Sequence, residues 1–195
     1  MTWFFMSKTI RTFIAIEIPK TVISKIRELQ GVIKAYGFKI RWVRAENIHL
    51  TLKFLGNINP ADIDSIGGAM VDAVGKIETF NLVAEGIGVF PGIKRPRVIW
   101  VGLKGQVQLL FAMQRLLEDN LAALGYKKEK RPFKGHLTLG RFRQTVNPDT
   151  IRQIMREHAN LSSEEFTAKR IILFKSDLQP SGAVYTRLKQ AELTE

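Results

Sequence analysis

Residues 49–56 read His-Leu-Thr-Leu-Lys-Phe-Leu-Gly, and residues 136–143 read His-Leu-Thr-Leu-Gly-Arg-Phe-Arg. The chain of 195 residues has three histidines, and two of them begin the same four-residue motif, 136 − 49 = 87 positions apart. Histidine is the side chain best suited to exchange protons near neutral pH. The repeat therefore predicts one acid and one base that face a single substrate from two halves of a folded unit.

The first motif is predicted to be a strand, in which successive side chains point to opposite faces. His49, Thr51 and Lys53 are then expected on one face. Leu50 and Leu52 are expected on the other face, where they anchor the strand in the core. Lys53 is accordingly a candidate substrate contact beside the imidazole and the hydroxyl.

The second motif places His136 and Thr138 on one face in the same way. Arg141 lies five positions after His136, so strict alternation sends it to the opposite face. Gly140 permits a bulge or a bend that would turn Arg141 back toward the histidine. Arg141 is therefore a candidate substrate contact whose position depends on the backbone at Gly140.

Two imidazoles and two hydroxyls that face each other suit a phosphodiester. Threonine hydroxyls can donate to the non-bridging oxygens, and a protonated and a neutral histidine can serve the leaving oxygen and the nucleophile. Arg141 and Lys53 would offset the developing negative charge. The arrangement requires no metal or other cofactor. A zinc site is the alternative, but neither motif has an Asp, Glu or Cys in phase as a third ligand.

The composition favours a polyanionic partner. The formal net charge is +12 and the isoelectric point is about 10.1, which strengthens contacts with RNA or DNA phosphates. The chain has no cysteine, which excludes disulfides and thiolate nucleophiles and suits a reducing compartment. The apolar stretch at residues 3–6 is too short for a signal or a membrane span. We expect a cytoplasmic protein without membrane contact, with residues 1–8 as an N-terminal extension.

Hydrophobic periodicity predicts alternating strands and helices in two similar halves. No linker separates the halves, so residues 1–195 are expected to form a single bilobal domain. Strands are expected at residues 12–18, 40–43, 48–55, 82–89, 97–103, 133–142, 165–175 and 183–188. Helices are expected at residues 19–37, 60–80, 106–124 and 148–159.

At the paired motifs the chain resembles the 2H phosphoesterase superfamily, and within it the RNA 2′,3′-cyclic phosphodiesterases, historically called 2′-5′ RNA ligases. The similarity extends from about residue 11 to about residue 190. The segments that carry it are residues 11–17, 41–43, 46–56, 90–91, 96–102 and 133–141.

The resemblance implies an α+β, bilobal fold in which two antiparallel sheets, related by a pseudo-twofold, line a central cleft with helices outside. It implies hydrolysis of RNA 2′,3′-cyclic phosphate ends to 2′-phosphomonoesters. His49 would be the proton donor and His136 the proton acceptor, and Thr51, Thr138 and Arg141 would hold the phosphate.

Several points stay open at this level. The substrate could be a tRNA-like fragment or a small cyclic nucleotide, and we expect a monomer. Ligation of 2′-5′ RNA ends would use the same two histidines. A basic module that binds RNA ends without turnover is the alternative from another class, and it predicts salt-dependent binding that survives the loss of both histidines.

Overall fold

The computed structural model describes residues 9–180 and 182–195. The expected N-terminal extension, residues 1–8, lies outside the described residues. The strands are β1 (Ile10–Glu17), β2 (Ile40–Trp42), β3 (His49–Ile58), β4 (Phe80–Phe90), β5 (Val98–Gly105), β6 (Leu137–Phe142), β7 (Phe166–Ala168), β8 (Arg170–Gln179) and β9 (Gly182–Glu192). The helices are α1 (Lys20–Lys34), α2 (Ile63–Val74), α3 (Val107–Ala123) and α4 (Pro148–Glu157), with short 3₁₀ turns η1 (Ala45–Asn47) and η2 (Pro60–Asp62).

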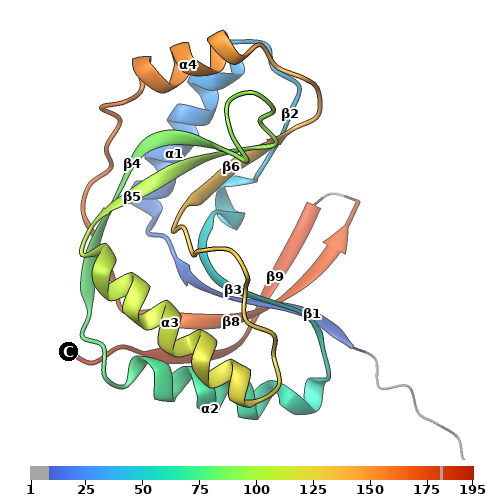
Figure 1. Ribbon diagram of the computed structural model, residues 1–195, viewed down its shortest axis with the longest axis vertical. Coiled ribbons are helices and arrows are strands. Elements are labelled where there is room, and N and C mark those ends of the chain that lie inside the picture. The colour runs from blue at the N-terminus through green and yellow to red at the C-terminus, as the bar shows by residue number, and fades with distance from the viewer. Residues whose placement is uncertain (1–8, 181) are drawn as a thin grey trace, which may run out of the picture.

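The strands form one curled antiparallel sheet in the order β7-β4-β5-β6-β3-β1-β8-β9, with β2 added beside β6. The prediction of an α+β fold with antiparallel sheets is confirmed. The two expected sheets, however, are continuous halves of one sheet. They are joined where β3 and β6 pair at Leu50 and Leu137. The twist of neighbouring strands separates β3 and β6 on either side of this pair, so the sheet bends sharply there and the molecule has the outline of a C (Figure 1).

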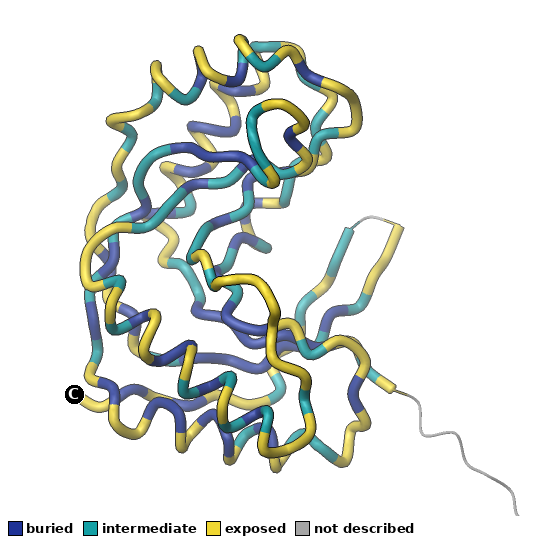
Figure 2. The backbone as a smooth tube through the Cα atoms, viewed as in Figure 1, coloured by how far each residue is buried: buried dark blue, intermediate teal, exposed yellow. Residues whose placement is uncertain are grey.

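The helices cover the convex side of the curled sheet (Figure 1). Helices α2 and α3 pack together beside the half that contains β1 and β3, whereas α1 and α4 lie beside the half that contains β6. The main apolar core lies between these helices and the sheet, and the buried stretches follow the strands and the inner helix faces (Figure 2). On the concave side, a small second cluster of Phe13, Ala15, Ile172 and Phe174 packs against Tyr185.

Three expected elements differ from the structure. The strand expected at residues 133–142 begins at Leu137. The strand expected at residues 165–175 is two strands: β7 pairs with β4 in one half, and β8 pairs with β1 in the other. The chain therefore crosses between the halves at Lys169. The helix expected at residues 60–80 ends at Val74, and Phe80 already begins β4. No helix within residues 9–180 and 182–195 is long and apolar enough to span a membrane.

Candidate active site

The pairing of Leu50 with Leu137 brings the two His-Leu-Thr motifs together. Both leucines are fully buried in the main core, so the residues on either side of them point to the concave face. In an antiparallel register centred on this pair, His49 lies across from Thr138, and His136 lies across from Thr51. The two histidines are then diagonal neighbours across this pair. A local twofold thus runs between the leucines, and both imidazoles and both hydroxyls surround it.

Each histidine is held by the same backbone contact. The distance from His49 Nδ1 to the carbonyl oxygen of Asn47 is 2.7 Å, and that from His136 Nδ1 to the carbonyl oxygen of Lys134 is also 2.7 Å. A carbonyl oxygen only accepts, so Nδ1 carries the proton in both rings. In the neutral rings Nε2 is therefore unprotonated and is the nitrogen that can accept a proton.

The ring of His49 is packed among aromatic side chains on the concave face. It stacks on Phe13 with ring centroids 4.6 Å apart, and the edge of Tyr185 lies 5.4 Å away. Burial lowers the pKa of His49 to about 4, the contact with the Asn47 carbonyl acts in the opposite direction, and the charge of His136 lowers the pKa further.

The ring of His136 has aromatic neighbours of its own. Phe90 approaches it edge-on at 5.0 Å, and Trp100 is 6.0 Å away. Lys134 Nζ lies 4.6 Å from the centroid of Trp100. The pKa of His136 is lowered, first by burial and then by the charges of Lys134 and Arg141, although the Lys134 carbonyl raises it. Both histidines are therefore neutral at neutral pH while no anion is bound.

The prediction that Lys53 shares the face of His49 is wrong. A bulge makes Leu52 an extra residue in β3: Thr51 pairs with Ala15, and Lys53 pairs with Ile14. Lys53 is consequently on the core face and only 7% exposed. Its Nζ donates to Glu118 Oε2 on α3 at 2.7 Å and to the carbonyl oxygen of Lys127 at 2.6 Å. It ties β3 to α3 and to the loop before β6, and it is not placed to contact a substrate.

The position of Arg141 follows from an equivalent bulge in β6. Thr138 pairs with Trp100 and Gly140 pairs with Ile99, so Leu139 is the extra residue. Arg141 pairs with Val98, two residues from Trp100 on β5, and it therefore shares the concave face with Thr138. The backbone change that sequence analysis required near Gly140 is present, and Arg141 is exposed on the face that carries His136.

Two buried glutamines support these bulges and were missed by sequence analysis. A bulge leaves backbone groups without their ladder partners. Gln114 Nε2 on α3 donates to the carbonyl oxygen of Leu52 at 3.4 Å, and Gln30 Nε2 on α1 donates to that of Leu139 at 3.0 Å. The available signal was a polar residue on the apolar side of each helix, 114 − 30 = 84 positions apart, which is close to the spacing of the histidines.

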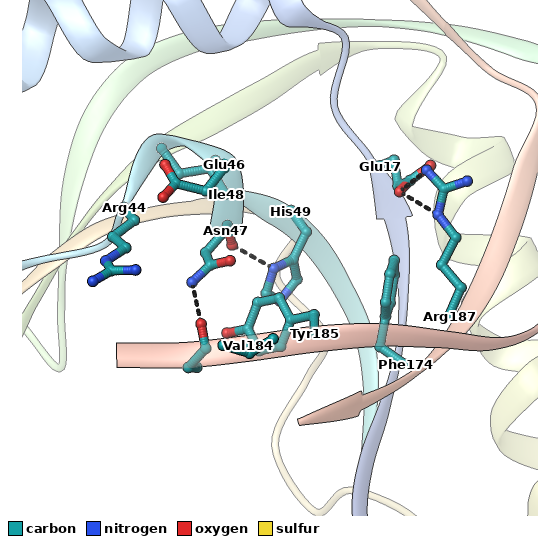
Figure 3. A pocket seen from close by; sticks show the side chains of 11 residues that line it. Glu17, Arg44, Glu46, Asn47, Ile48, His49, Phe174, Val184, Tyr185 and Arg187 are labelled. Carbon is teal, nitrogen blue, oxygen red and sulfur yellow. Dashed lines mark hydrogen bonds and ion pairs between the residues drawn. The ribbon is translucent and has the colours of Figure 1, made fainter. Parts of the chain in front are cut away.

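A pocket of about 330 Å³ lies directly beside His49 (Figure 3). Its walls come from η1, the end of β1 and the β8–β9 hairpin. Asn47 Nδ2 donates to the carbonyl oxygen of Ala183 at 2.8 Å and so fixes the hairpin against η1. Arg187 and Glu17 form an ion pair at 2.6 Å on the opposite wall. The pocket leaves room for part of a substrate next to the His49 ring.

The third histidine and a metal site are the other candidates among the described residues. His158 is the C-cap residue of α4 and is not among the residues that line the pocket beside His49. Among residues 9–180 and 182–195, no three His, Cys, Asp or Glu side chains are grouped so that they could hold a metal ion.

The duplication is also found when the chain is compared with known proteins. The model of the LigT-like phosphoesterase family matches it twice, over residues 16–100 and 101–185. Each match contains one of the two motifs, at a similar distance from its start. The chain belongs to the LigT-like phosphoesterase family.

Relatives of this phosphoesterase are similar over nearly their whole length. The chain is 32% identical over 180 residues to an RNA 2′,3′-cyclic phosphodiesterase of Methanocaldococcus jannaschii, covering 92% of this chain and 99% of the relative. It is 27% identical to the enzyme of the same name in Methanothermobacter thermautotrophicus, with 92% and 97% covered.

Solved structures of the same fold show how far the architecture agrees. The structure of the protein TT0787 from Thermus thermophilus has a TM-score of 0.75 at 23% identity, covering 94% of this chain and 97% of the other. Escherichia coli LigT in its apo form has a TM-score of 0.70 at 24% identity, with 97% and 100% covered. These likenesses establish the bilobal phosphoesterase fold.

Proposed function

We propose that this phosphoesterase hydrolyses the 2′,3′-cyclic phosphate at the 3′ end of an RNA and leaves a 2′-phosphomonoester. The observation that carries the proposal is the equivalent setting of His49 and His136 on either side of the local twofold, each with Nδ1 held by a backbone carbonyl. Membership of the family and the names of its relatives in archaea support the substrate class. We further propose that residues 1–195 act as one bilobal domain.

In the proposed reaction His136 is the base and His49 is the acid. The unprotonated Nε2 of His136 accepts a proton from water as the water oxygen forms a bond to phosphorus. The bond from phosphorus to the 3′ oxygen breaks, and protonated Nε2 of His49 donates its proton to that oxygen. His136 then holds one proton more and His49 one fewer, and exchange with solvent restores both. The reaction balances without a metal or another cofactor.

The negative charge of the substrate favours protonation of His49, the proposed acid. Burial keeps the pKa of His49 low in the free protein, whereas a phosphate anion beside the ring favours the imidazolium form. Thr51 and Thr138 are proposed to donate to the non-bridging oxygens, and the guanidinium of Arg141 is proposed to offset the charge that grows in the transition state. The same groups would serve a 5′-hydroxyl acceptor in place of water.

The decisive experiment is incubation with an RNA that ends in a 2′,3′-cyclic phosphate, in the presence of excess chelator, followed by identification of the product. The proposal expects a 2′-phosphate end and an undiminished rate in chelator. A 3′-phosphate product would reverse the roles of the oxygens and contradict the mechanism, and activity that returns only with added zinc would contradict metal independence. A 2′-5′ joined product in the presence of 5′-hydroxyl RNA would favour ligation.

A further inference from the structure

Arg41 lies directly across from Arg141 on neighbouring strands. In the antiparallel pairing of β2 with β6, Arg41 pairs with Arg141 and Trp42 pairs with Gly140. Trp42 lies on the helix side, where Lys34 of α1 is 5.6 Å from its ring centroid. Since alternate residues of a strand point to opposite faces, Arg41 points to the concave face, beside Arg141. Both arginines are exposed.

This pair of like charges has no acidic partner in the part of the chain that the structure describes. The ion pairs of residues 9–180 and 182–195 include neither Arg41 nor Arg141. Like charges directly across a pair of strands are destabilising. Two uncompensated guanidinium groups therefore favour an anion between or beside them, and a second phosphate satisfies both when Arg141 already holds the first.

We propose that Arg41 binds the phosphate that precedes the cyclic end, so that an RNA oligonucleotide is a better substrate than a mononucleotide. This inference rests on the proposed function. The backbones of β2 and β6 are about 5 Å apart, and two long side chains that start from them can reach consecutive phosphates of one strand. Arginine also suits phosphate because its planar fork donates to two oxygens at once. The net charge of +12 adds a general attraction for such a polyanion.

The test uses three substrates and three proteins. The substrates are a trinucleotide with a 2′,3′-cyclic phosphate end, the same trinucleotide with a neutral methylphosphonate as its last internucleotide linkage, and a nucleoside 2′,3′-cyclic phosphate. The proteins are the full chain, Arg41→Gln, and Arg27→Gln as a control. Arg27 is an exposed arginine on α1, so the control removes the same charge from the convex side.

We expect Arg41→Gln to lower kcat/KM for the charged trinucleotide about tenfold, as for the loss of one charge-assisted contact. The neutral trinucleotide and the nucleoside cyclic phosphate should be unaffected, and Arg27→Gln should match the unaltered protein on all three. The dependence of log KM on log salt for the charged trinucleotide should become shallower by about 0.7, the value for one single-strand phosphate contact. The unfolding temperature of Arg41→Gln should not fall, because the substitution relieves repulsion.

Three results would overturn the inference: no loss on the charged trinucleotide, an equal loss on all three substrates, or a lowered unfolding temperature that accounts for the loss. If the unaltered protein hydrolyses none of the substrates, the proposed function fails separately. Binding of a trinucleotide with a 2′-phosphate end then still tests Arg41. Weaker binding with a shallower salt dependence in Arg41→Gln, but not in Arg27→Gln, would support the contact, and equal binding would refute it.

Discussion

The two halves of the molecule share one backbone arrangement around the histidine but differ in the residues that surround it. In both motifs the fourth residue is a bulged leucine, a helix glutamine donates to its carbonyl oxygen, and the histidine Nδ1 is 2.7 Å from a backbone oxygen. The halves diverge immediately after the bulge. The first half has Lys53 and Phe54 where the second has Gly140 and Arg141. The repeat therefore sets the positions of the histidines, and the two residues after each bulge make the site asymmetric.

Because of this asymmetry, Lys53 is a structural cation, whereas Arg141 is available to a ligand. Lys53 turns into the core and is bound to Glu118, whereas Arg141 remains exposed on the concave face. At the position equivalent to Arg141, the first half presents the exposed ring of Phe54. The charges of Lys134 and Arg141 act on His136, whereas His49 lies beside the Phe13 and Tyr185 rings, so the two histidines have distinct electrostatic environments.

Removing either histidine tests whether the two halves act as one catalytic unit. We expect His49→Ala and His136→Ala each to lower kcat roughly 10²–10⁴-fold on a cyclic-phosphate RNA end, because each removes one proton transfer. The double variant should lose little more than the worse single variant, since residues that act together are not additive. His158→Ala is the control and should keep its activity. Losses that multiply in the double variant would show that the histidines act independently.

Lys53 and Glu118 test the structural side of the comparison. Their side chains are only 6% and 12% exposed, and removal of one partner leaves a buried charge. Lys53→Met should therefore lower the free energy of unfolding by about 3–5 kcal/mol, measured by urea denaturation. Adding Glu118→Leu should recover most of this loss, because an apolar pair of similar volume replaces the ion pair.

The control for Lys53 is a surface pair of the same chemistry. Lys104 is bound to Glu85, but its side chain is 68% exposed. Lys104→Met should therefore change the free energy of unfolding by less than about 1 kcal/mol. Similar losses at Lys53 and Lys104 would contradict the view that burial makes the Lys53 pair structural.

The sequence predicts correctly to which face of the sheet the first three side chains of each motif point, because alternation is a property of the strand itself. It fails at Lys53 because the bulge at Leu52 depends on pairing with β1 and on Gln114, both distant in the chain. The sequence places Arg141 on the face of His136 only because Gly140 permits a bulge or a bend. The Leu50–Leu137 pair, which joins the halves, has no local signal, and neither does the crossing at Lys169 that divides one predicted strand between the two halves.

The unequal burial of the two histidines predicts an unequal effect of pH on stability. Burial lowers the pKa of His49 to about 4, whereas the unfolded chain titrates near its usual value of about 6.5. Below about pH 6.5 the unfolded state binds a proton that the folded state does not bind, so stability falls as the pH falls toward 4. The loss from His49 over this interval is on the order of 3 kcal/mol.

Urea unfolding from about pH 7.5 down to about pH 4.5 separates this contribution from that of the carboxylates. Substituting the histidine removes only its own titration, so the difference between the full chain and His49→Gln should stay constant above pH 6.5 and change steadily below it, in favour of the variant. His136 is less buried and its pKa is lowered for the same reason, so His136→Gln should show the same trend with a smaller total change. Equal total changes for the two variants would mean that the halves bury their histidines alike, and parallel curves for all three proteins would mean that neither ring is neutral because of burial.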